Sequence, residues 1–202
     1  YTRLLKNFPD SPHIPAATLS LGQSLYQLGK YDEAIANFAK LIESDGAQLA
    51  DGAHWLAITL MRQNKPAEAL EMLTGVLDRV ADSPIGPAIQ LDYADALYAV
   101  PGKLEEARAA YEKFATEFAD DPLAPRAAYN AAFAALQGGK FADARRWSET
   151  FLEKYPEDPL RNEVAYIAAE SLLQQGEHQA AMEAYGKLLK ADPNKANTLL
   201  WK

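Results

Sequence analysis

The sequence predicts an all-α fold, in which antiparallel helical hairpins stack side by side into a right-handed superhelical solenoid. Five segments resemble one another, and each combines an apolar pattern of helical period with one interrupting turn and one alanine at a fixed place. The alanines are Ala34, Ala69, Ala107, Ala144 and Ala181, at successive spacings of 35, 38, 37 and 37 residues. A period of this length is typical of a repeat made of two helices.

The first full repeat shows how each hairpin is built. Apolar side chains at residues 21–28 recur at helical spacing, and Gly29-Lys30 then ends the helix. Residues 35–42 form a second apolar face. Asp32 lies in the first turn of this second helix, where a carboxylate suits the positive end of the helix dipole. We therefore expect two antiparallel helices joined by a short turn.

Proline and acidic residues mark the links between hairpins, because proline cannot continue the interior of a helix. The expected organisation is the second helix of a truncated repeat at 1–12, repeats at 13–48, 49–83, 84–122, 123–159 and 160–195, and the start of a further repeat at 196–202. This organisation predicts about eleven to twelve helices. Both ends fall inside repeats, so we expect the chain to be part of a longer one.

The anchoring alanines are expected where the two helices of a hairpin cross. A larger side chain there would force the helices apart and cost about 1–3 kcal/mol through overpacking. One hairpin buries too little surface to stand alone, so stacking of several repeats must supply the core.

The first repeat also resembles the tetratricopeptide repeat family. Its residues Leu21-Gly22, Leu25, Tyr31, Ala34 and Phe38 reproduce the family pattern of Leu-Gly, an aromatic residue and Ala-x3-Phe. Single repeats depart from the pattern. The second has Pro66 at the start of its second helix, the third has an extra Pro101 in its turn, and the fourth has Ser148 in place of the aromatic residue, next to Trp147.

The linkers, rich in proline, aspartate and serine, and the period above 34 residues are similar to those of bacterial envelope members of this family. These members include the lipoprotein of outer-membrane barrel assembly and the periplasmic partner of the Tol–Pal system. The resemblance implies a periplasmic or cell-envelope location, with a cytoplasmic scaffold as the alternative.

Composition excludes several classes of partner. The chain has 28 acidic and 20 basic residues and a formal net charge of −8, which argues against nucleic acid and against an acidic membrane surface. It has no cysteine, so disulfides and thiolate metal sites are excluded. No run of about 18 apolar residues occurs, so no membrane-spanning segment is expected.

Catalytic and metal-binding patterns are not found. The three histidines, His13, His54 and His178, stand far apart, whereas zinc needs three or four clustered ligands. The Gly-Lys pairs lack the preceding glycine and the following Ser or Thr of a phosphate-binding loop. Acidic pairs such as Glu105-Glu106 fall at helix starts, where carboxylates satisfy free amides. We therefore expect no enzyme activity, no metal and no cofactor.

The resemblance implies a concave surface lined by the first helices of successive repeats. By the repeat register, the candidate partner-binding residues on it are Tyr129, Phe133, Tyr166, Tyr26, Tyr98, His54, Asp95 and Glu170, and the register also places Leu91 there. Aromatic side chains suit an interface because they bury a large area at a low entropy cost. The alternative is that these aromatic residues are core between repeats.

Three functions remain open. The first is a non-enzymatic scaffold that binds a peptide or protein partner in the concave groove, within an envelope complex. The second is a co-chaperone-like domain that grips an acidic tail; that reading requires asparagine where Gln23 and Ile58 stand, and lysines that the groove lacks. The third is an accessory or self-association domain of a larger multidomain protein.

Overall fold

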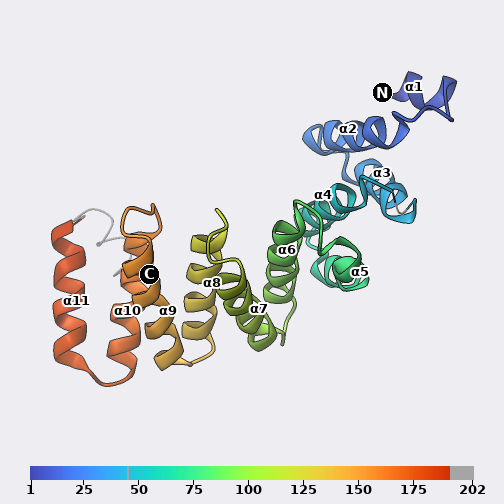
Figure 1. The fold of residues 1–202 in the computed structure, drawn as a ribbon. Helices are drawn as coiled ribbons and strands as arrows, with labels where there is room; N and C mark the ends of the chain where they lie inside the picture. Colours follow the sequence, from blue (N-terminus) through green and yellow to red (C-terminus); the bar gives the residue numbers. More distant parts are fainter. Residues whose placement is uncertain (45, 192–202) are drawn as a thin grey trace. The chain divides into compact units, whose positions relative to one another are not determined.

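The computed structural model describes residues 1–44 and 46–191, which form eleven helices and no strand (Figure 1). The helices are α1 (Thr2–Asn7), α2 (Ile14–Gln27), α3 (Tyr31–Glu43), α4 (Leu49–Arg62), α5 (Pro66–Val80), α6 (Gly86–Ala99), α7 (Leu104–Glu117), α8 (Ala124–Gln137), α9 (Phe141–Lys154), α10 (Arg161–Gln174) and α11 (His178–Ala191). The predicted all-α solenoid of helical hairpins is confirmed. The expected further repeat at 196–202 lies outside the described residues.

The chain divides into two compact units, Tyr1–Pro101 and Gly102–Lys202. In the first unit, each helix from α2 to α6 packs against the next one along the chain, and α4 also contacts α2 and α6. In the second unit, α7 to α11 pack in the same serial way, and α8 also contacts α10. First helices of successive hairpins therefore meet each other within each unit, as stacking of repeats requires.

The anchoring alanines are at the centre of this packing. Four of the five have no exposed surface, and the last, Ala181, is 1% exposed. A glycine has a similar role in the first hairpin, because a Cβ at Gly22 would lie 2.5 Å from the ring of Phe38. Phe38 itself is completely buried, so the ring has little room to move away. Close approach of the helices thus depends on small side chains at the crossing.

The turns inside the hairpins follow from the sequence. Gly29 has a φ of 73°, in the left-handed region that glycine enters without steric cost, and the amide of Lys30 donates to the carbonyl of Leu25 at 2.9 Å. Asn64 takes the place of this glycine in the next hairpin, with a φ of 59°. Asparagine tolerates this conformation better than most residues do. The second hairpin can therefore turn at Asn64-Lys65 without the glycine found in the other turns.

The acidic links also have a structural reason. The carboxylate of Asp121 accepts a hydrogen bond from the amide of Leu123 at 2.8 Å, and Asp158 accepts one from Leu160 at the same distance. Each bond satisfies a backbone donor just before a first helix begins, as aspartate does in tight turns. The aspartates therefore help to set where α8 and α10 begin.

The departures from the family pattern fit the fold. Pro66 is the first residue of α5, a position where its missing amide hydrogen is not needed. Ser148 is completely buried, and its hydroxyl donates to the carbonyl of Ala144 at 2.8 Å. Trp147, next to it, is 9% exposed, so the fourth repeat buries an aromatic ring at a shifted position.

We predict that Ala144→Leu lowers the free energy of unfolding by about 1–3 kcal/mol, because Ala144 is completely buried where the helices of its hairpin cross. The measurement is denaturant unfolding, with Ala142→Leu as the matched control on the exposed side of α9. An unchanged midpoint for Ala144→Leu would show that this alanine does not limit the packing.

We also predict that Gly22→Ala destabilises the chain by about 1–3 kcal/mol, because the added methyl group collides with the buried Phe38 ring. Gly75→Ala is the control, since a Cβ at this exposed position in α5 meets no atom within 4 Å. The control should stabilise the chain by about 0.5–1 kcal/mol through helix propensity. Thermal unfolding of both variants tests this opposite pair of shifts, and a shift of the same sign in both would contradict it.

Candidate functional site

Two of the predicted aromatic residues form a pair on α8. Tyr129 and Phe133 lie four residues apart, and their rings stack with centroids 6.0 Å apart and an interplanar angle of 11°. This spacing brings them to the same face of the helix. Both side chains are half-buried, so each ring keeps part of its surface exposed to solvent.

Tyr166 lies on α10 at the position equivalent to Tyr129, one repeat later. Its ring is 6.0 Å from the ring of Tyr185 on α11, and the Tyr185 hydroxyl donates to Oε2 of Glu170 at 2.7 Å. Burial, followed by the hydrogen bond to Glu170, raises the pKa of Tyr185, so this hydroxyl stays protonated and keeps donating at neutral pH. Burial also raises the pKa of Tyr166. Glu170 is therefore held in place by α11.

The structure puts these aromatic residues on neighbouring helices. Because α8 and α10 contact each other within the second unit, Tyr129, Phe133 and Tyr166 belong to adjacent first helices, as their spacing predicted. A purely structural role in the core would require all three side chains to be fully buried. None of the three is fully buried. We call these three residues the aromatic row.

The predicted residues of the first unit are placed differently. Tyr26 on α2 packs 5.5 Å from Tyr31 and 5.6 Å from Trp55, measured between ring centroids. Trp55 in turn stacks on the buried Phe38, with centroids 6.1 Å apart. Tyr26 thus takes part in an aromatic cluster that joins α2, α3 and α4, and this cluster has a clear packing role.

Sequence reasoning missed Trp55 and Asp92. The imidazole Nδ1 of His54 on α4 lies 2.5 Å from Oδ2 of Asp92 on α6, and both side chains are largely shielded. The hydrogen bond to Asp92 raises the pKa of His54, against the opposite effect of burial. The signal for this pair was present, since Asp92 follows His54 by 38 residues, the spacing between Ala69 and Ala107.

The remaining candidates of the first unit lie on α6. Asp95 is half-buried, and Tyr98 is 37% exposed. The expectation that Leu91 faces the concave surface was wrong, because Leu91 is 1% exposed. A leucine between two packed helices gains more from burial than from solvent contact, by about 1.5–3 kcal/mol.

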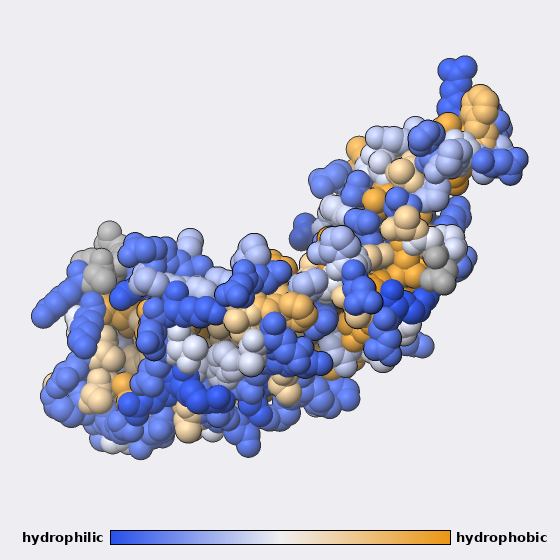
Figure 2. Space-filling view, viewed as in Figure 1, coloured by the Kyte–Doolittle hydropathy of each residue, from blue (hydrophilic) through white to orange (hydrophobic). Residues whose placement is uncertain are grey.

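The apolar surface is divided into small patches on the face drawn in Figure 2. On the face drawn in Figure 2, hydrophilic side chains cover most of the surface, and apolar side chains show in small patches between them. Across residues 1–44 and 46–191, no three His, Asp or Glu side chains gather in a way that could hold a metal ion. In the same residues, no helix is both long and apolar enough to cross a membrane.

Two family models match the sequence. The model described as tetratricopeptide repeat matches residues 1–48 and 56–122, and the model described as outer membrane lipoprotein matches residues 92–199. Together the two matches cover residues 1–48 and 56–199. No curated protein matches the chain by sequence.

Several solved structures have a fold similar to that of this chain. A structure of MamA has a TM-score of 0.75 at 16% identity, with 93% of this chain and 96% of that chain covered. MamA from Desulfovibrio magneticus RS-1, residues 41 to the end, has a TM-score of 0.72 at 13% identity, covering 90% and 96%. YrrB, described as a TPR protein with an unusual peptide-binding site, has 0.72 at 14%, covering 95% and 91%. At these identities the likeness shows a shared fold.

The His54–Asp92 pair generates a prediction on pH. Because the folded pKa of His54 is raised, the pair stabilises the fold fully below the ordinary value of 6.5, and this contribution is lost as pH rises through the folded pKa. We therefore expect the loss of stability caused by His54→Gln to be largest between about pH 5 and pH 6.5 and to shrink toward pH 8.5. Denaturant unfolding across this range measures it, with the exposed His178→Gln as control. A loss that stays constant with pH would contradict it.

Proposed function

Because this chain belongs to the tetratricopeptide repeat family and, across residues 92–199, to the outer membrane lipoprotein family, we propose that it is a non-enzymatic scaffold that binds a peptide or protein segment along the first helices of its repeats. The repeats would be the units expected from the sequence, with the concave surface presented by α8 and α10 in the second unit.

The observation that carries this proposal is the half-exposure of the aromatic row. Tyr129, Phe133 and Tyr166 keep ring surface in contact with water although they lie on adjacent helices. Exposed apolar rings in a group are costly unless a partner covers them. Tyrosine also offers a hydroxyl at its tip, which lets one side chain serve an apolar and a polar contact together.

The chemistry of the row favours a partner segment that is partly apolar. Glu170, next to Tyr166 on α10, is already engaged by the hydroxyl of Tyr185 and by the amide of Gln174 at 2.8 Å. The predicted surface contains no lysine, so it offers little to an acidic tail. This argues for the scaffold and against the tail-gripping co-chaperone function.

The cell envelope is the location that this proposal favours, with the cytoplasm as the alternative. The match to the outer membrane lipoprotein model supports it, as do the linkers of the repeats.

Self-association of the chain, an alternative function, has one supporting observation of its own. Met182 and Leu189 on α11 are 62% and 39% exposed, and a second copy could cover them. Mass measurement in solution separates these two functions, since a scaffold for other proteins does not require a dimer.

We predict that Tyr129→Ala combined with Tyr166→Ala weakens partner binding by a few kcal/mol, which is more than tenfold, while helicity stays unchanged. The partner is first isolated by affinity capture from the native organism and then titrated against both proteins. Tyr1→Ala is the matched control, because it removes the same side chain from a position that is 63% exposed outside the row. Equal affinity of the double variant and the control would place the binding site elsewhere.

A further inference from the structure

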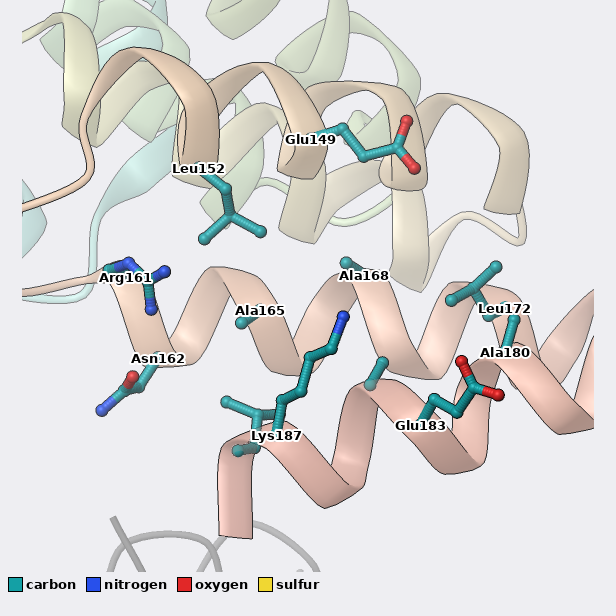
Figure 3. Close-up of a pocket in the computed structure, with 12 residues that line it drawn as sticks. Glu149, Leu152, Arg161, Asn162, Ala165, Ala168, Leu172, Ala180, Glu183 and Lys187 are labelled. Carbon is teal, nitrogen blue, oxygen red and sulfur yellow. The ribbon is translucent and has the colours of Figure 1, made fainter. Parts of the chain in front are cut away.

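A second surface of the second unit is a groove between α9, α10 and α11. It holds a cavity of about 420 Å³, within the range of about 300–1,000 Å³ found for binding pockets (Figure 3). Its floor is a stripe of small and apolar side chains on α10, namely Ala165, Ala168 and Leu172, and Leu152 and Leu188 add apolar surface from α9 and α11. The groove involves none of the aromatic row.

The preceding hairpin shows the same place closed. Helices α8 and α9 repeat as α10 and α11 at a spacing of 37 residues, so the floor of the groove corresponds to Ala128, Ala131 and Ala135 on α8. These three alanines are at most 2% exposed, whereas Ala165, Ala168 and Leu172 are all partly exposed. The helices have the same lengths in both places, whereas several side chains on the neighbouring helices differ.

One difference is the loss of an indole ring. Trp147 on α9 is 9% exposed, and the equivalent residue on α11 is Ala184, which lines the groove. The ion pairs across the helices differ as well. Arg108 and Asp143 lie 3.7 Å apart and join α7 to α9, whereas Ala180 stands in the place of Asp143, and Arg145 pairs instead with Glu177 at 2.9 Å, one residue before α11 begins. Both changes remove material that would cover the floor.

The second difference is a reversal of charge. Arg146 on α9 lies 3.8 Å from Glu112 on α7, and this ion pair spans the closed place. The equivalent residues at the groove are Glu183 and Glu149, both negative. Two carboxylates cannot form an ion pair with each other, so the equivalent of the bridge between Arg146 and Glu112 is missing at the groove. Three replacements thus remove side chains or bridges that cover the equivalent place between α7 and α9.

Among the described residues, the acidic side chains around the groove have partners, whereas two basic ones have no ion pair. Glu149 pairs with Arg145 at 2.8 Å, and Glu183 accepts a hydrogen bond from the side-chain amide of Gln179 at 3.0 Å. Within residues 1–44 and 46–191, no ion pair engages Arg161 or Lys187. In Figure 3, Arg161 lies at the start of α10, and Lys187 extends from α11 toward the floor. Two cations thus remain for a partner.

We propose that this groove binds a peptide segment of another protein through one aromatic side chain that lies on the alanine floor, next to acidic residues that pair with Arg161 and Lys187. The chain itself places an indole at the equivalent position, Trp147, which is the ground for choosing an aromatic anchor. The net charge of −8 opposes an acidic segment at long range, but at physiological salt this repulsion is screened beyond about 8 Å.

The test uses the whole chain and a short fluorescent peptide with a central tryptophan and aspartates on one side, in both orders, followed by fluorescence anisotropy. Ala184→Trp fills the groove from inside and should weaken binding by at least about tenfold. Lys187→Glu, a change at an exposed position, should weaken it by about threefold. Ala109→Trp adds the same indole at an exposed position on α7 and should leave affinity unchanged. Circular dichroism checks that each variant keeps its helicity.

Several results would overturn the proposal. These are absence of binding in both peptide orders, equal affinity of Ala184→Trp and the unchanged chain, or equal affinity for a peptide with alanine in place of tryptophan. Dimerisation that Ala184→Trp abolishes would assign the groove to a second copy of the chain. Phe133→Ala in the aromatic row should leave the affinity of the groove for the tryptophan peptide unchanged. This variant therefore distinguishes failure of the groove proposal from failure of the proposal for the aromatic row.

Discussion

Each hairpin of this chain holds together because a side chain with at most one carbon stands where its two helices cross. The buried alanines and Gly22 set the distance between helices, and the large apolar side chains then fill the space on either side. Phe38 shows the dependence directly, since its ring occupies the space that a Cβ at Gly22 would need. Stacking, and with it the placing of every surface residue, follows from this spacing.

Sequence alone predicted the fold because its strongest signals are local and periodic. Alanine at the crossing, glycine after the first helix and proline at the links each act within one hairpin. It also placed the aromatic row on adjacent helices, because Tyr129 and Tyr166 share one register position. It did not find the contact of His54 with Asp92 or the cluster around Trp55. Such contacts between hairpins depend on side-chain rotamers and on which of two neighbouring helices a side chain faces.

The groove on α10 could not be predicted for a related reason. A family pattern describes what repeats share, and this groove exists where two repeats differ. Trp147 and Ala184 share one register position, and the family pattern allows either residue there. The exposure of the α10 floor, compared with the buried floor on α8, is what distinguishes the two places. In a repeat protein, departures from the repeat are therefore where specific binding is to be sought.

Helix α10 belongs to both surfaces through opposite sides. Tyr166 and Glu170 are four residues apart on the side toward the aromatic row, whereas Ala165 and Ala168 are three apart on the side of the groove. Small side chains on the groove side leave room for a proposed partner to approach the backbone closely, and Tyr166 projects from the other side. Tyr185 on α11 donates to Glu170 and lies against the ring of Tyr166, so the helix that forms one wall of the groove also contacts the residue of the aromatic row on α10. Because α10 is one continuous helix from Arg161 to Gln174, its two sides present different side chains without any change in its backbone hydrogen bonds.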